Sequence, residues 1–291
     1  MSLRLVHSFV SRNCDDKNLF IHLSYFILSC IYAKKAGFEI ALHCDNRTMD
    51  ILKIAPYDEI INDLENVPSP ANKTIYAWSK FKAMENEPLG TIHIDGDVFL
   101  KSEGLKDVLD FNEYDCIVQS IEHYNTFNNN LLFNNNSKHV FLKNIWEKNT
   151  ALFMQCKYPV WANRKCESMF NCGVVGFNNQ ELKNEYFNTY WKMLDLYNKT
   201  GLMVYNTTPD IIIEQQFLKD LVENNKYKVK FVLPYCNSFD ELCKNANRIN
   251  YQHVIGGSKK ENIEKVLLLI KKHDEHVYNE LMNIRKKLYD I

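Results

Sequence analysis

One apolar stretch that ends in two carboxylates decides the fold: Ile92-His93-Ile94-Asp95-Gly96-Asp97-Val98-Phe99. Its apolar residues predict a buried strand over residues 91–94. Gly96 lets the backbone of the following turn approach a ligand closely. Carboxylate oxygens two residues apart suit hard divalent ions such as Mg²⁺ or Mn²⁺, which also bind phosphate oxygens. The D-x-D pattern alone is weak, because many exposed turns contain it.

Strands and helices alternate around this stretch. Further strands are predicted at residues 4–10, 39–44, 57–61, 115–120, 170–177 and 228–233, and helices at residues 18–35, 48–54 and 74–85. The alternation predicts an α/β fold with a mostly parallel central sheet flanked by helices. Ligands of such sheets bind at the carboxyl ends of the strands. Polar residues follow Val10, Cys44 and Ile94, so all of them are expected at that edge.

A second motif lies far downstream, in the segment Tyr251-Gln252-His253-Val254-Ile255-Gly256-Gly257-Ser258-Lys259. Its pattern is H-x-x-G-x-x-K. An imidazole can be a further ligand of Mn²⁺, glycines allow phosphates to approach the backbone, and a lysine can neutralise a phosphate charge. The alternative is a buried structural histidine before an ordinary Gly-Gly turn and a solvated helix start.

Four motifs in this order resemble those of the glycogenin and lipopolysaccharide galactosyltransferase family of retaining GT-A enzymes. They are Asp95-x-Asp97, Phe170-Asn171-Cys172-Gly173-Val174-Val175, Glu214-Gln215 and His253-x-x-Gly256-x-x-Lys259. The resemblance runs from the first strand to Lys259. It implies a single GT-A, Rossmann-like catalytic domain over residues 1–259, with residues 260–291 as a C-terminal helix packed on it or on a partner.

The resemblance also implies roles for these residues. Asp95, Asp97 and His253 would bind Mn²⁺ or Mg²⁺, with Asp95 also counted among the donor contacts. Gly256 and Lys259 would hold the diphosphate of a nucleotide-sugar co-substrate, a UDP-sugar. The remaining motif residues, Asn171, Glu214 and Gln215, would touch the sugar and the acceptor. The implied activity is retaining transfer of the sugar to a saccharide, a lipid-linked acceptor or another hydroxyl, with the leaving phosphate helping to take the acceptor's proton.

Three further residues are weaker candidates for donor binding. Lys80 lies in the helix before the D-x-D strand, where such enzymes place a basic donor contact, whereas Lys82 is expected on a solvated face. Ser8 and Asp45 close two strands at the binding edge, and the resemblance places the nucleotide's base and ribose there. Ordinary polarity at strand ends explains these two residues equally well.

The chain also departs from the family pattern. Glu214-Gln215 replaces the usual Asp-Gln pair, and Lys259-Lys260-Glu261 replaces the usual Lys-Pro-Trp. These departures indicate a divergent member. An exposed helix after Pro209-Asp210 is the alternative interpretation of the Glu214 segment. The Asn-rich residues 125–137 are predicted to form a loop, and the acceptor pocket is expected within residues 125–165.

Residues after Lys259 are predicted to form one long helix. Ile263, Ile270, Val277 and Ile284 recur every seven residues, a spacing typical of helix-helix packing. Such a helix can dock on the core, pair with a second copy as a homodimer, or lie on a membrane surface through its lysines.

Composition limits the other classes of function. A net charge of −1 argues against nucleic acid as a partner. The N-terminus does not resemble a signal peptide, and no apolar run reaches the ~18 residues of a membrane span. The nine cysteines include no C-x-x-C pair and are expected to be reduced thiols. We therefore expect a cytoplasmic protein, with peripheral membrane contact left open.

Three rival functions fit parts of the pattern. In aspartyl-phosphate phosphatases a D-x-D carboxylate attacks phosphorus, but that motif closes their first strand, whereas here two βα units precede it. A nucleotidyltransferase would place a glycine-rich loop after the first strand, and residues 10–13 contain no glycine. The non-catalytic alternative is a sugar-nucleotide-binding protein. If the transferase interpretation holds, Asp97→Asn should abolish turnover and leave folding nearly intact, because Asp97 is expected at a solvated edge.

Overall fold

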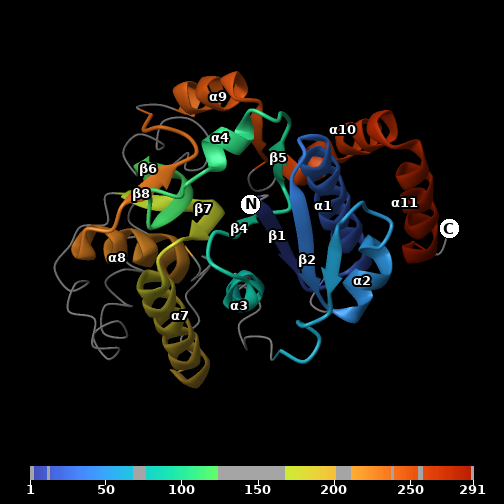
Figure 1. The fold of residues 1–291 in the computed structure, drawn as a ribbon. Coiled ribbons are helices and arrows are strands. Elements are labelled where there is room, and N and C mark those ends of the chain that lie inside the picture. Colours follow the sequence, from blue (N-terminus) through green and yellow to red (C-terminus); the bar gives the residue numbers. More distant parts are fainter. Residues whose placement is uncertain are drawn as a thin grey trace, which may run out of the picture. The chain divides into compact units, whose positions relative to one another are not determined.

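The computed structural model describes residues 3–11, 14–67, 77–123, 168–200, 211–236, 239–254 and 258–289. The chain divides into two compact units, which Figure 1 shows together. The first unit comprises Met1–Pro68, Ser79–Asp110 and Ala246–Ile291, and the second comprises Ser69–Trp78 and Phe111–Asn245. The predicted Asn-rich loop at residues 125–137 lies outside the described residues.

Four parallel strands form the sheet of the first unit. They are β1 (Arg4–Phe9), β2 (Glu39–Cys44), β3 (Glu59–Ile61) and β4 (Ile92–Ile94), in the order β3-β2-β1-β4. The register pairs Val6 of β1 with Ala41 of β2 and with His93 of β4. The predicted alternation of strands and helices is therefore confirmed, and all these strands end at one edge.

Helices cover the two faces of this sheet. Consecutive residues of a strand point to opposite faces. On one face Val6 and Ala41 pack with Ala83 of α3 (Trp78–Asn86). On the other face His7 contacts Phe26 of α1 (Asp16–Lys35), with ring centroids 5.0 Å apart. The short helices α2 (Asn46–Leu52) and α4 (Leu105–Leu109) complete the unit together with the C-terminal helices.

Local sequence sets the ends of α1. The side chain of Asp15 accepts a hydrogen bond from the Asn18 amide, which caps the first turn. Gly37, directly after the C-cap, has a φ of +75°, a conformation that favours glycine. The helix that the sequence predicted therefore begins two residues earlier than expected and stops where Gly37 indicated.

A short ribbon continues the D-x-D turn and was not predicted. Strand β5 (Val98–Leu100) pairs antiparallel with β9 (Tyr251–His253), and Val98 lies opposite His253. Each strand has three residues, too few to show an alternating pattern in the sequence. The ribbon brings the second sequence motif to the first.

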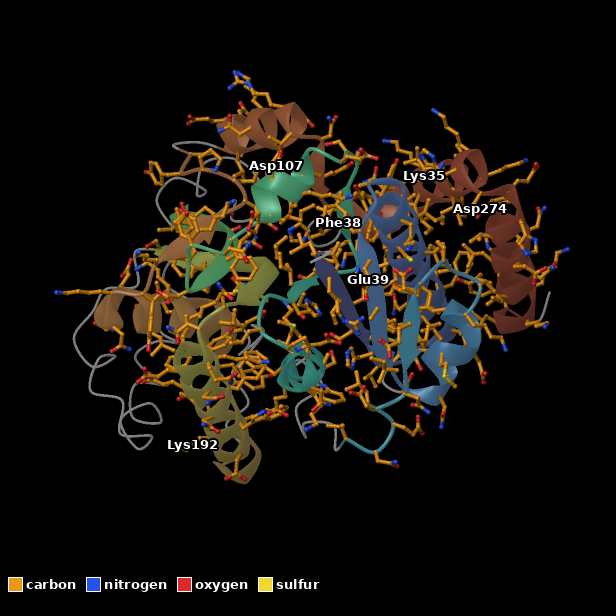
Figure 2. All side chains as sticks on the ribbon, in the orientation of Figure 1. Lys35, Phe38, Glu39, Asp107, Lys192 and Asp274 are labelled. Atoms are coloured by element: carbon orange, nitrogen blue, oxygen red, sulfur yellow. The ribbon has the colours of Figure 1, made fainter. Side chains whose placement is uncertain are left out.

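The C-terminal segment is helical, as predicted, and both of its helices contact α1 (Figure 1). It is not one continuous helix but α10 (Ser258–His273) followed by α11 (Glu275–Leu288). Asp274 separates them, and its side chain accepts a hydrogen bond of 3.0 Å from the Val277 amide. Figure 2 labels Asp274 where the two helices meet. An aspartate is a strong N-cap, which explains why the heptad pattern did not produce a single helix.

The described residues of the second unit contain three strands. Their order is β7 (Ser168–Phe177), β6 (Cys116–His123) and β8 (Val229–Phe231), and β6 pairs antiparallel with β7 and parallel with β8. Against β7 pack α7 (Gln180–Thr200), a π-helix at Ile211–Gln216 and α8 (Phe217–Asn225), and α9 (Phe239–Arg248) follows. Most strand pairs among the described residues are thus parallel. No helix in the described part of the chain has the length and apolar character needed to cross a membrane.

Candidate metal centre

The D-x-D turn joins β4 to β5. The Val98 amide donates a 2.9 Å hydrogen bond to the carbonyl of Asp95, which closes the turn around Gly96. A Cβ on Gly96 would lie 2.3 Å from the ring of Phe26, so only glycine fits between the turn and α1. The side chain of Asp95 is about one-third exposed, whereas Asp97 is buried. The expectation that Asp97 sits at a solvated edge is therefore wrong, because the second motif covers it.

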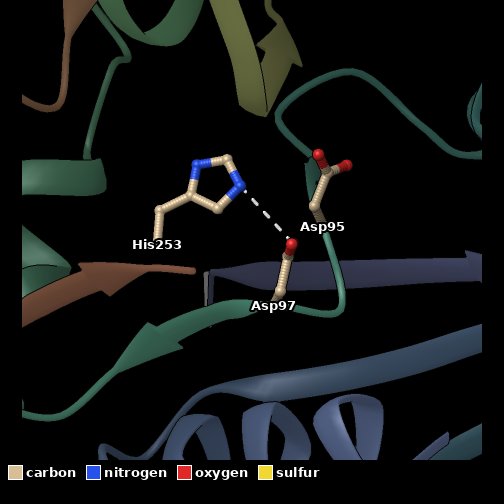
Figure 3. A group of neighbouring side chains, drawn as sticks. All are labelled: Asp95, Asp97 and His253. Atoms are coloured by element: carbon tan, nitrogen blue, oxygen red, sulfur yellow. Dashed lines mark ion pairs between the residues drawn. The ribbon is translucent and has the colours of Figure 1, made fainter. Parts of the chain in front are cut away.

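His253 reaches this turn through the β5–β9 ribbon. The Val254 amide donates a 3.0 Å hydrogen bond to the carbonyl of Asp97, and the His253 Nε2 lies 3.4 Å from Asp97 Oδ1. Figure 3 shows the imidazole turned toward the two carboxylates. One donor atom from each of Asp95, Asp97 and His253 lies within 4.8 Å of the others.

These donors fit a divalent ion. Two carboxylates and one imidazole provide oxygen and nitrogen ligands, a set that suits Mn²⁺ and is acceptable to Mg²⁺. In the described part of the chain, no other group of three such side chains comes as close. The residues present therefore match the metal that the sequence motifs imply.

Positive side chains border both carboxylates. Lys259 Nζ lies 2.7 Å from Asp97 Oδ2, and Lys80 Nζ lies 2.9 Å from Asp95 Oδ1. Burial alone raises the pKa of Asp97, but His253 and Lys259 outweigh it and hold this pKa well below its ordinary value. Burial lowers the pKa of His253, and the charge of Asp97 more than compensates, so the net shift is upward.

His93 supports the turn from beneath and was not singled out from the sequence. Its Nε2 shares a 2.9 Å hydrogen bond with Ser8 Oγ. Its Nδ1 has no hydrogen-bond partner among the described residues and lies 3.8 Å from Asp95 Oδ1. Burial and the charge of Lys80 hold its pKa far below the ordinary value, so the imidazole is neutral. The one signal in the sequence that could have identified His93 is its position within an otherwise apolar strand.

Asp45 organises the end of β2. Its carboxylate accepts hydrogen bonds from the Thr48 amide at 2.9 Å and from the Ser11 amide at 2.8 Å. It thereby caps α2 and ties Ser11, two residues after the end of β1, to that helix. A nucleotide contact of Ser8 or Asp45 stays a prediction.

One face of α1 lies against the site, whereas the sequence predicted only that residues 18–35 form a helix. Tyr25 stacks on Phe99 of β5 with ring centroids 6.0 Å apart, and Ser29 Oγ donates a 2.5 Å hydrogen bond to the Val98 carbonyl. His22, one turn earlier, is partly buried. Its pKa falls to about 4, first because of burial and then because of the positive charge of Lys259.

Three predicted sugar or acceptor residues belong to the second unit. Asn171 donates a 2.6 Å hydrogen bond to Glu122 and accepts one of 2.9 Å from the Gly173 amide. Glu214 lies in the π-helix and is buried, so the alternative of an exposed helix is wrong. The adjacent Gln215 is half-buried. Gly256 lies outside the described residues.

The chain matches the model of a family of unknown function, DUF6734, over residues 5–284. It belongs to this family. No curated protein matches it. Among solved structures, this DUF6734 chain is similar to the galactosyltransferase LgtC bound to donor and acceptor sugar analogues. That match has 12% identity, a TM-score of 0.47, and coverage of 92% of this chain and 95% of LgtC.

Two further glycosyltransferases show weaker similarity. GlyE of Streptococcus pneumoniae TIGR4 is 11% identical with a TM-score of 0.45, and the match covers 99% of this chain and 64% of GlyE. Mouse xyloside xylosyltransferase 1 is 11% identical with a TM-score of 0.34, and the match covers 97% of this chain and 93% of that one. At this level the neighbours do not assign an activity, which must be inferred from the site.

Proposed function

We propose that this chain is a metal-dependent glycosyltransferase that moves a sugar from a nucleotide-sugar, a UDP-sugar, to a hydroxyl of a saccharide or lipid-linked acceptor. The observation that carries the proposal is the meeting of His253 and Lys259 with the D-x-D carboxylates. Nothing local in the sequence requires these segments to meet. Their meeting provides three metal ligands and an adjacent cation, which are the groups that a diphosphate leaving group needs.

The proposed residues have two roles, which their charges set. Asp95, Asp97 and His253 would hold Mn²⁺ or Mg²⁺, which would neutralise the charge developing on the leaving diphosphate. Lys259 and Lys80 add fixed positive charge beside the carboxylates. In the transfer, the bond from the sugar's anomeric carbon to the diphosphate oxygen breaks and the bond to the acceptor oxygen forms. The acceptor's proton leaves with the diphosphate.

The finer parts of the proposal rest on the family resemblance. Retention of configuration would follow from attack on the same face that the diphosphate leaves. Asn171, Glu214 and Gln215 are proposed to contact the sugar and the acceptor. Gly256 is proposed to let the diphosphate approach the backbone, and Ser8 and Asp45 are proposed near the nucleoside.

The phosphatase alternative explains less of the site. An aspartyl-phosphate phosphatase needs one nucleophilic carboxylate after its first strand, whereas this D-x-D follows β4 of the sheet. Such a mechanism has no use for an imidazole 3.4 Å from the second carboxylate. The transferase proposal uses His253, Lys259 and both aspartates.

The test is a thermal-shift screen of nucleotide-sugars with and without Mn²⁺, followed by assays of donor hydrolysis. A ligand at 100 times its Kd should stabilise the folded protein by about 2.7 kcal/mol. We expect the shift to require Mn²⁺ and to disappear in Asp97→Asn but not in Asp50→Asn, which removes an exposed carboxylate of α2. Release of phosphate from phosphomonoesters, with Asp95 trapped as an acyl phosphate, would favour the phosphatase instead.

A further inference from the structure

Tyr25 is a buried residue of α1 that touches both motifs of the site. Its ring stacks on Phe99 of β5 at an interplanar angle of 10°. Its hydroxyl donates a 3.1 Å hydrogen bond to the backbone carbonyl of Lys259, in the first turn of α10. A single side chain therefore connects the strand after the D-x-D turn to the residue that faces Asp97.

His253 and Lys259 are fixed in different ways. Strand pairing positions His253, because Val98 lies opposite it and the next amide bonds to Asp97. Lys259 lies beyond that pairing, in the first turn of α10, and the end turns of helices fray. A lysine side chain also has many rotamers, so the place of its ammonium group depends on how well its backbone is held. Tyr25 provides that attachment.

The hydroxyl of Tyr25 is suited to act as a permanent donor. Tyr25 is 1% exposed, and its pKa rises to about 12, first because of burial and then because of the charge of Asp97. The hydroxyl therefore keeps its proton at working pH and donates to a carbonyl that can only accept.

We propose that Tyr25 is a positioning residue that fixes the first turn of α10, so that the Lys259 ammonium lies beside the metal site, where it binds the diphosphate. This inference rests on the proposed function for the identity of the anion. Tyr25 itself touches neither metal nor diphosphate. It acts through Lys259, so its effect should vanish when that ammonium group is removed.

The experiment is a double-mutant cycle on anion binding. Wild type, Tyr25→Phe, Lys259→Met and the double variant are titrated calorimetrically with inorganic diphosphate at saturating Mn²⁺. Phenylalanine keeps the ring against Phe99 and removes only the hydroxyl. The matched control is Tyr32→Phe, since Tyr32 lies on the same helix and also contacts Phe99, with ring centroids 5.7 Å apart. Melting temperatures and the Kd for Mn²⁺ alone are measured on every variant.

We expect Lys259→Met to raise the Kd for diphosphate about tenfold or more, as loss of a charged hydrogen bond does. Tyr25→Phe should raise this Kd roughly threefold, and the double variant should bind no more weakly than Lys259→Met. The Kd for Mn²⁺ alone should be nearly the same in Tyr25→Phe and wild type, because the β5–β9 ribbon holds His253. Tyr32→Phe should bind diphosphate like wild type.

Each contrary result has one meaning. An unchanged diphosphate Kd in Tyr25→Phe, or additive effects in the double variant, would overturn the positioning role and leave the proposed function standing. A Lys259→Met protein that binds diphosphate like wild type, or a wild type that binds none, would overturn both. The four diphosphate Kd values could follow the expected pattern while the protein neither transfers nor hydrolyses any nucleotide-sugar. That result would support the positioning role and overturn the proposed function.

Discussion

His253 Nε2 lies 3.4 Å from Oδ1 of Asp97, while Lys259 Nζ lies 2.7 Å from the other oxygen of the same carboxylate. Asp97 is thus a buried carboxylate held between the imidazole of His253 and the ammonium group of Lys259. Removing either partner leaves a buried charge less well compensated, which is costly in a protein interior. The site is therefore sensitive to single substitutions both in ligand binding and in folding.

The first prediction concerns metal dependence. Replacing His253 with Ala removes the nitrogen ligand and should weaken Mn²⁺ binding by at least about tenfold, because three donor side chains become two. Isothermal titration with Mn²⁺ measures this, and a chelator should abolish donor hydrolysis in wild type. His276→Ala removes an exposed imidazole of α11 and serves as the control. Equal Mn²⁺ affinity in both variants would show that His253 is not a ligand.

The second prediction compares the stabilities of the two aspartate variants. Asp97→Asn should lower the free energy of unfolding by about 1–3 kcal/mol, since a buried carboxylate that pairs with Lys259 and His253 is lost. Asp95→Asn should lower it by less than about 1 kcal/mol, because that carboxylate is partly exposed and its pair with Lys80 is screened by solvent. Urea denaturation without added metal measures both values. The reverse order would contradict the burial described for Asp97.

The third prediction concerns the close approach of Gly96 to the ring of Phe26. Gly96→Ala places a Cβ 2.3 Å from the Phe26 ring and should destabilise the fold by about 1–3 kcal/mol through overpacking. Gly104→Ala is the matched control, because its Cβ would meet nothing closer than Ser102 Oγ at 3.9 Å.

The origin of this effect is tested in a second background. In Phe26→Ala the ring is absent, so the further loss of stability caused by Gly96→Ala should shrink. Denaturant midpoints of wild type, Gly96→Ala, Phe26→Ala and the double variant give the coupling between the two residues. An equal loss in both backgrounds would mean that the turn rejects alanine for a reason other than Phe26.

Local patterns predicted much of the fold. The apolar runs of β1, β2 and β4 and the periodicity of α1 are local properties, and the edge that carries Asp95 followed from the parallel order of strands. Pairing of β5 with β9 could not be predicted, because each strand is three residues long and the pairing joins distant segments. The break at Asp274 was missed because the heptad pattern continues across a residue that prefers to cap.

The supporting contacts of the site were also beyond local patterns. The family resemblance predicted that His253 and Lys259 lie beside the carboxylates. For Tyr25 and Phe26, the sequence showed only the apolar periodicity of a helix. Their roles depend on which atoms approach them in three dimensions, as with the Gly96 turn over Phe26. The neutral His93 beneath Asp95 likewise depends on burial that composition does not reveal.

Another buried histidine, His43 of β2, connects two acidic residues in the same unit. Its Nδ1 lies 2.8 Å from Asp63, and its Nε2 lies 3.0 Å from Glu87, which also binds Arg4. Burial disfavours the charged imidazole, but the hydrogen bonds with Asp63 and Glu87 outweigh it and raise the pKa of His43 to about 9. Burial likewise disfavours charge on Glu87, and His43 and Arg4 lower its pKa to about 2. Both groups are therefore charged in the folded protein near neutral pH.

The last prediction follows from these pKa shifts. Because folding raises the pKa of His43 from 6.5 to about 9, its contribution to stability is complete below pH 6.5 and is lost as the pH rises through about 9. The contribution of Glu87 is present above pH 4.5 and is lost as the pH falls through about 2. The free energy of unfolding of wild type, minus that of His43→Gln, should therefore fall by about 2–3 kcal/mol between pH 6 and pH 10. Urea denaturation across this range measures the difference, and His276→Gln, on the exposed face of α11, should follow wild type throughout. A constant difference between wild type and His43→Gln would show that folding does not raise the pKa of His43.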